Sequence, residues 1–73
     1  MTPAVPVVSG AEVVRALGKA GFERVGQRGS HVKLRHVDGR TVIVPMHREL
    51  ASGTLRSILR QAGFSADGFR ELL

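Results

Sequence analysis

The alternation of side chains over residues 31–36 constrains the fold more than any other feature of this chain. Apolar and polar residues follow one another strictly there, which is the pattern of a strand with one buried face. The buried face holds Val32 and Leu34, and the outer face holds His31, Lys33 and Arg35. Asp38-Gly39 then marks a tight turn, and the apolar run 41–44 returns as a second strand that ends at Pro45.

A helix and a further strand are predicted before this hairpin. Ser9 and Glu12 have the spacing of a capping box, in which each residue bonds the backbone amide of the other. Aliphatic residues recur at helical spacing over 10–20, and Gly21 provides a left-handed stop. A short strand is expected over 22–27.

Two more helices are predicted after the hairpin. A loop over 46–51 leads to a helix capped by Ser52 or Thr54, in which apolar residues recur at i, i+3, i+4 and i+7. Gly63 ends this helix, and Ser65 caps a short last one.

The predicted class is α+β, with a two-layer α-β-β-β-α order, a short C-terminal helix and a three-stranded antiparallel sheet. Both long helices are amphipathic, so they are expected to stack on one face of the sheet and leave the other face open. A chain of 73 residues has room for a single core. We therefore expect an extended N-terminal arm at 1–8 and one domain at 9–73.

The pairing of the last two strands depends on the turn between them. With a two-residue turn, Leu34 pairs with Ile43 towards the helices, and Val42 and Val44 face outwards. A turn one residue longer exchanges the two faces of the last strand. Outward valines on a basic sheet would suit an acidic protein partner.

The charge balance favours a polyanionic partner. Eleven Lys and Arg residues stand against six Asp and Glu, for a formal net charge of +5, and nine of the eleven are arginine. The planar guanidinium group matches phosphate in a bidentate way. The alternative is a solvated basic surface with no nucleic-acid partner. Aromatic stacking platforms are scarce, since the chain has three Phe and neither Trp nor Tyr. Recognition of a nucleic acid by its shape and backbone is therefore favoured over base stacking.

Composition also restricts the other functional classes. The chain has no cysteine, which excludes thiolate catalysis and cysteine-based zinc sites, and its three histidines lack a metal-binding pattern. We expect neither a metal nor a cofactor. No apolar run is long enough to span a membrane, and the N-terminus lacks the pattern of a signal peptide, so a cytoplasmic protein is expected.

His31 is the candidate catalytic residue. An imidazole can exchange a proton with a ribose 2′-hydroxyl or a leaving 5′-oxygen near neutral pH, and neighbouring cations can stabilise the phosphorane charge without a metal. The alternative is a polar surface histidine. His36 is expected to pack or cap beside the turn, and His47 follows Pro45 in a loop, where it could approach the sheet or stay in water. The expected RNA contacts are Arg28, Ser30, Lys33, Arg35, Arg56 and Arg60.

Several short motifs follow one another along nearly the whole chain. They are Ala20-Gly21-Phe22, Gly29-Ser30-His31, Arg35-His36-x-Asp38-Gly39-Arg40, Val44-Pro45-x-His47 and the run from Gly53 to Gly63. In this order and spacing the chain resembles the HicA family of toxin mRNA interferases. The resemblance implies a fold like that of double-stranded RNA-binding domains, and a type II toxin that cleaves mRNA as a metal-independent endoribonuclease with His31 as its single catalytic histidine.

The resemblance also implies a protein partner, a HicB-type antitoxin. Such an antitoxin would cover the active face and, together with the toxin, repress their shared operon on operator DNA. We expect its contacts at His31, Lys33, Val42 and Val44. A non-catalytic RNA-binding module of the same fold is the alternative function.

Overall fold

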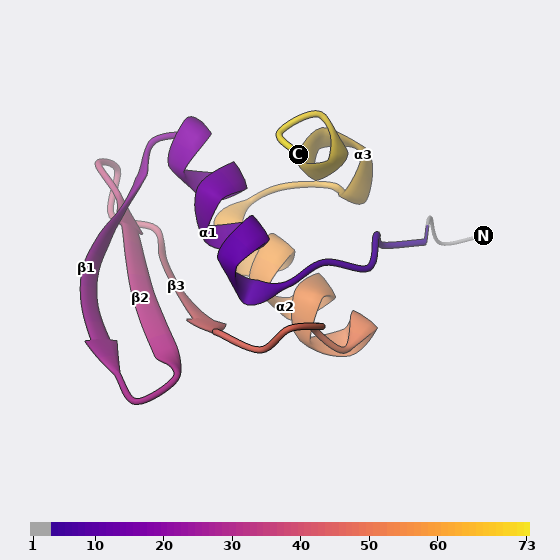
Figure 1. The fold of residues 1–73 in the computed structure, drawn as a ribbon. Coiled ribbons are helices and arrows are strands. Elements are labelled where there is room, and N and C mark those ends of the chain that lie inside the picture. Colours follow the sequence, from indigo (N-terminus) through magenta and orange to yellow (C-terminus); the bar gives the residue numbers. More distant parts are fainter. Residues whose placement is uncertain (1–3) are drawn as a thin grey trace.

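The computed structural model describes residues 4–73, in which a three-stranded sheet is covered on one face by helices (Figure 1). The elements are α1 (Gly10–Lys19), β1 (Phe22–Arg28), β2 (His31–His36), β3 (Thr41–Pro45), α2 (Ser52–Ala62) and α3 (Ala66–Arg70). The strands are antiparallel and lie in the order β1-β2-β3. This confirms the predicted α+β class and element order.

The capping box of α1 is present as predicted. The Ser9 hydroxyl accepts a hydrogen bond from the Glu12 amide at 3.1 Å, and the Glu12 carboxylate accepts one from the Ser9 amide at 2.9 Å. The hydrogen bond from the Ser9 amide is the largest cause that lowers the pKa of the Glu12 carboxyl, and the Ser9 side chain lowers it further. After the last residue of α1, Gly21 adopts φ +98°, the left-handed conformation expected of the stop.

The predicted cap of α2 is wrong. The N-cap residue is Ala51, and no side chain caps this helix, so neither Ser52 nor Thr54 has the expected role. Leu50 is buried and its amide donates to the Val8 carbonyl at 2.9 Å, which brings the chain into the helix directly after Leu50. The α3 cap is confirmed, because the Ser65 hydroxyl accepts from the Gly68 amide at 3.0 Å.

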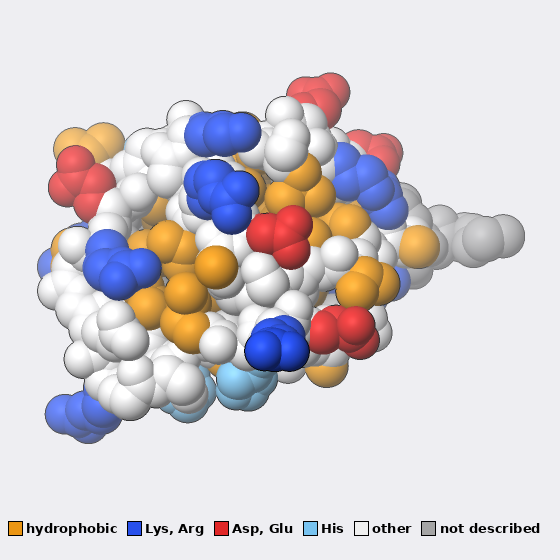
Figure 2. Space-filling model, in the orientation of Figure 1, with side chains coloured by type: hydrophobic (Ala, Val, Ile, Leu, Met, Phe, Trp, Pro, Cys, Tyr) orange, Lys and Arg blue, Asp and Glu red, His pale blue; other side chains and the backbone are white. Residues whose placement is uncertain are grey.

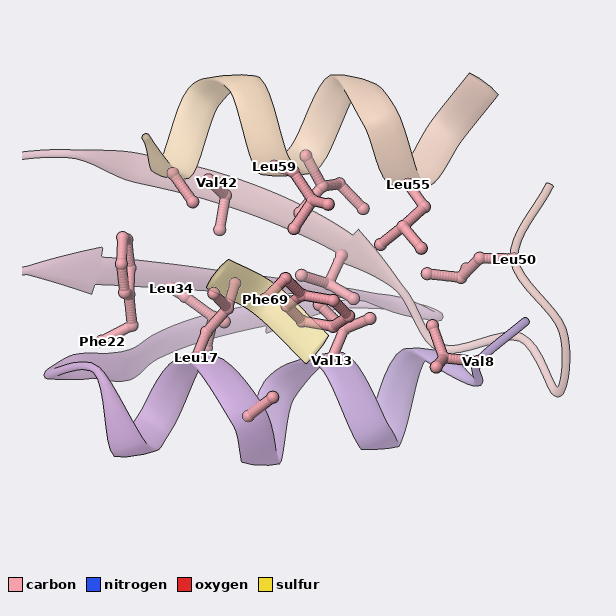
Figure 3. Close-up of a cluster of buried hydrophobic side chains, with 14 of the residues drawn as sticks. Val8, Val13, Leu17, Phe22, Leu34, Val42, Leu50, Leu55, Leu59 and Phe69 are labelled. Carbon is pink, nitrogen blue, oxygen red and sulfur yellow. The ribbon is translucent and has the colours of Figure 1, made fainter. Parts of the chain in front are cut away.

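The core lies between the inner face of the sheet and the helices (Figure 3). α1 and α2 lie on either side of Phe69, which α3 inserts between them as a fully buried side chain. The predicted arm is not detached from this core, since Val8 is buried and Val5 is partly buried against it. The first three residues of the predicted 1–8 arm lie outside the described residues.

The register of β2 and β3 corrects the two-residue-turn prediction. Leu34 pairs with Val42, not with Ile43, and Val32 pairs with Val44. The turn contains three residues, because the His36 amide donates to the Arg40 carbonyl and the Gly39 amide donates to the His36 carbonyl, each at 2.9 Å. Gly39 has φ +99°, as in a type I turn followed by a left-handed glycine.

The extra turn residue exchanges the faces of β3. Val42 and Val44 are buried in the core with 1% and 0% of their surface exposed, whereas Ile43 faces outwards and is 45% exposed. The expectation that Val42 and Val44 face outwards to contact an antitoxin is therefore wrong. The alternative of a turn one residue longer is the one found.

Three polar residues at the β2–β3 turn and one aromatic residue at the start of β1 form a cluster that we call the hairpin clamp: Phe22, His36, Asp38 and Arg40. The Arg40 guanidinium lies 5.3 Å from the centre of the Phe22 ring, donates to the Asp38 carboxylate at 2.8 Å and reaches the Ala62 carbonyl at the end of α2. His36 packs its ring on Phe22 at 5.2 Å, and its Nδ1 accepts the Asp38 amide at 3.2 Å. His36 thus packs and caps, as predicted.

Candidate active site

The side chains that alternate with the core residues of β2 face the uncovered side of the sheet. His31, Lys33 and Arg35 are all exposed, while Val32 and Leu34 between them are buried. The helices lie on the opposite side of the sheet (Figure 1). His31 therefore faces the open side of the sheet, as the alternation of β2 predicts.

The neighbours of His31 come from all three strands. Its cross-strand partner on β1 is Arg28, and its partner on β3 is Pro45. Lys33, the next outward residue, lies between Gly26 and Ile43. Together with Gln27, five of these six residues line a hollow on the sheet face, namely Gly26, Arg28, His31, Lys33 and Ile43.

A bulge and a glycine open this hollow on the β1 side. The register of β1 against β2 slips between Arg24 and Gly26, so that Val25 is an extra residue without a partner. The slip aligns Gly26 with Lys33, and a glycine has no side chain to cover the sheet there. The hollow is thus bordered by cations on either side of an imidazole and has an apolar rim at Ile43.

The turn that precedes His31 is anchored on both sides. Gly29 adopts φ +56°, which glycine accepts without strain, and its carbonyl accepts the Gln27 side-chain amide at 3.0 Å. The Ser30 carbonyl accepts the Met46 amide at 2.6 Å, a bond that extends the β2–β3 ladder beyond Pro45. Ser30, which directly precedes His31, is exposed to solvent. These contacts fix the strand position from which His31 projects.

Arg35 lies on the same face but at the other end of β2. It is four residues from His31, which is roughly 13 Å along a strand. Its cross-strand partners are Glu23 and Thr41, and its Nε lies 3.4 Å from the Thr41 hydroxyl. Arg35 therefore lies outside the hollow, which Arg28 and Lys33 line.

The structure does not bring Arg56 and Arg60 to this face. Both lie on α2, and they line a separate depression on the helical side with residues of the arm and of the α2–α3 connection, among them Val5 and Phe64. The residues expected to contact RNA therefore lie in two separate places on the molecule. Helical spacing correctly places Arg56 and Arg60 on one side of α2, but that side points away from the sheet.

Sequence reasoning missed two residues of the open face. Ile43 and Pro45 border the positions of Lys33 and His31, whereas the two-residue-turn register gave Ile43 to the core. The length of the turn carries this information, because one residue more exchanges the two faces. Asp38-Gly39 fits turns of both lengths, so the dipeptide alone could not distinguish them.

Within residues 4–73, no group of three or more His, Asp or Glu side chains is arranged to hold a metal ion. Over the same residues, none of the helices is long and apolar enough to cross a membrane.

The comparison with protein families gives one result. A family model described as the HicA toxin of bacterial toxin–antitoxin systems matches residues 10–64 of the 73. The matched range runs from the start of α1 to just beyond α2, so it includes the whole sheet with His31 and the hairpin clamp. No curated protein matches the chain.

Proposed function

The chain belongs to the HicA toxin family of bacterial toxin–antitoxin systems, and we propose that it is a metal-independent endoribonuclease that cleaves mRNA with His31 as its catalytic histidine. The observation that supports this proposal is the position of His31, exposed in a hollow of the open sheet face with Arg28 directly across the ladder. We place the activity in the cytoplasm, where mRNA is available.

In the proposed reaction, neutral His31 takes the proton of a ribose 2′-hydroxyl. The 2′-oxygen then forms a bond to the adjacent phosphorus as the bond from phosphorus to the 5′-oxygen breaks and the departing 5′-oxygen takes up a proton from a general acid or from water. The products are a 2′,3′-cyclic phosphate and a 5′-hydroxyl end. Arg28 and Lys33 border the same hollow, so their charges stabilise the negative charge that grows on the phosphorane oxygens. This chemistry requires no metal, because RNA carries its own nucleophile.

The remaining cations would bind the rest of the RNA. Ser30 would contact the nucleotide at His31, and Arg35 would contact a phosphate farther along β2. Arg56 and Arg60 lie on the helical side, so we propose them only as contacts for distant phosphates of a longer or folded RNA. Removing Arg56 or Arg60 should lower the affinity for RNA and the salt dependence of that affinity. It should not change the rate at which bound RNA is cleaved.

The proposed protein partner is a HicB-type antitoxin that covers the open face. Its contacts would include His31 and Lys33, and Ile43 would provide the apolar contact that Val42 and Val44 cannot make from the core. Such a complex would block RNA from the hollow. Repression of the shared operon would belong to this complex on operator DNA and not to the toxin alone.

The experiment that tests the enzyme proposal uses purified protein and end-labelled RNA in the presence of EDTA. The wild-type protein should produce fragments with cyclic phosphate ends, and His31→Ala should lower the cleavage rate by about 10²–10⁴-fold, the scale expected for a general base. Arg48→Gln, at an exposed position outside the hollow, is the matched control.

The alternative function predicts a different result in the same assay. A non-catalytic RNA-binding module would retain RNA in a salt-dependent way and leave every strand intact, with or without His31. Expression in a bacterium gives a second reading, since only the toxin should arrest growth and His31→Ala should relieve the arrest. Equal arrest by both proteins would remove His31 from the mechanism.

A further inference from the structure

A second histidine, His47, follows the β3 residue that pairs with His31. Pro45 is the cross-strand partner of His31, and the bond from the Met46 amide to the Ser30 carbonyl continues the ladder by one more residue. His47 follows at once, roughly 7 Å along the strand direction from Pro45. It is exposed, and strand alternation assigns it to the open face with Ile43 and Pro45. In Figure 2, histidine side chains (pale blue) lie along the lower edge of this face of the molecule.

The backbone of His47 is held in place although it lies outside the strands. Its carbonyl accepts the Gly10 amide at 2.9 Å, at the first residue of α1. Gly10 is buried against this segment so closely that a Cβ there would lie 2.1 Å from the Pro45 carbonyl oxygen and 2.8 Å from the Met46 Cα. The start of α1 therefore fixes the distance between His47 and the sheet.

We propose that His47 is the general acid of the reaction, which rests on the proposed endoribonuclease function. Cleavage needs one proton removed from the 2′-hydroxyl and one given to the leaving 5′-oxygen. Neutral His31 accepts the first as the bond from the 2′-oxygen to phosphorus forms, and protonated His47 gives the second as the bond to the 5′-oxygen breaks. After the reaction His31 is protonated and His47 is neutral, and proton exchange with water returns both to their starting states.

The pH dependence follows from these opposite states. The rate should rise with pH as His31 loses its proton and fall as His47 loses its own, which gives a bell-shaped profile. The charged residues next to His47 in the chain are Arg48 and Glu49. On the neighbouring elements, Arg28 is the cross-strand partner of His31, and Glu12 follows Gly10, whose amide donates to the His47 carbonyl. Glu12 is engaged with Ser9 through the capping box, so it is not free to act as the acid.

The test uses two RNA oligonucleotides of one sequence, cut at one mapped position. In the first the leaving atom is the natural 5′-oxygen, and in the second it is a 5′-sulfur, which departs without protonation. His47→Gln should lower the rate on the oxygen substrate by about 10²–10³-fold and remove the alkaline limb of its pH profile. On the sulfur substrate it should remain within a few-fold of the wild type. His31→Ala should be slow on both, and Arg48→Gln should behave as the wild type on both.

The two proposals fail in different ways in this experiment. Equal loss by His47→Gln on both substrates, or no loss on either, would overturn the role of His47 and leave the endoribonuclease standing. Absence of cleavage by the wild-type protein would overturn the proposed function and, with it, this inference. Circular dichroism and the melting temperature of His47→Gln are compared with those of the wild type, so that equal loss on both substrates counts against the role of His47 only in a folded variant.

Discussion

The hairpin clamp connects the sheet to α2, and its contribution to stability can be tested by replacing Arg40. Arg40 reaches from the β2–β3 turn to the Ala62 carbonyl at the C-terminal end of α2. It also pairs with Asp38 and lies over the ring of Phe22. No other side chain of the turn makes these three contacts in the described part of the chain. We predict that Arg40→Ala destabilises the fold without touching the hollow at His31.

The size of the effect follows from the three contacts. A hydrogen bond from a charged donor contributes about 1.5–3 kcal/mol, and the contact over Phe22 contributes about 0.5–1 kcal/mol. The pair with Asp38 is exposed to solvent, which screens it, so it adds little to the stability. Since such terms are not additive, we expect a loss of about 2–3 kcal/mol, or roughly 10–20 °C in the melting temperature of a domain this small.

Thermal melts followed by circular dichroism measure this loss. Arg35→Ala is the matched control, because Arg35 flanks the same turn on the open face. Among residues 4–73, its side chain makes a single hydrogen bond, a long one of 3.4 Å to the Thr41 hydroxyl. Arg40→Lys keeps the charge but lacks the planar fork, so it should fall between Arg40→Ala and the wild type. The clamp interpretation fails if Arg40→Ala melts within about 2 °C of Arg35→Ala, a shift below that expected for 1 kcal/mol.

Two further predictions concern acid stability and register. Hydrogen bonds from Arg40 lower the pKa of Asp38 from 3.8 to about 2. The Asp38 carboxylate therefore stabilises the fold above pH 4, and this contribution is lost as the pH falls from 4 through 2. Between pH 7 and pH 2.5, the melting temperature of Asp38→Asn should fall less than that of the wild type. Ile43→Lys should fold with a stability within about 0.5 kcal/mol of the wild type. Val44→Lys should not fold, because it buries a charge in the core. If circular dichroism shows the opposite, the two-residue-turn register is correct and the three-residue turn is wrong.

Local signals in the sequence predict the elements well. The capping box at Ser9 and Glu12, the alternation over 31–36 and the serine cap of α3 all depend on residues within a few positions of one another. The start of α2 could not be predicted in this way. It depends on the burial of Leu50 and on its bond to Val8, which lies more than forty residues earlier in the chain.

The candidate site could be predicted only as far as one strand determines it. The position of Arg28 and Lys33 near His31 follows from the short β1–β2 turn and from alternation. The separation of Arg56 and Arg60 from that group does not, because helical periodicity identifies the outward side of α2 but not its direction relative to the sheet. One turn residue determines which side chains of β3 face the core. Val42, Ile43 and Val44 are all apolar, so their pattern does not show which of them face inwards.

The proposed base and the proposed acid therefore depend on different parts of the structure. His31 faces the open side in either register, because Val32 and Leu34 fix the orientation of β2 by themselves. His47 lies near His31 only because the three-residue turn pairs Pro45 with His31. In the shorter register Met46 would take that place, and alternation would turn His47 towards the helices. The β2–β3 turn, at the far end of the sheet from the hollow, thus sets whether the second imidazole can reach the scissile phosphate.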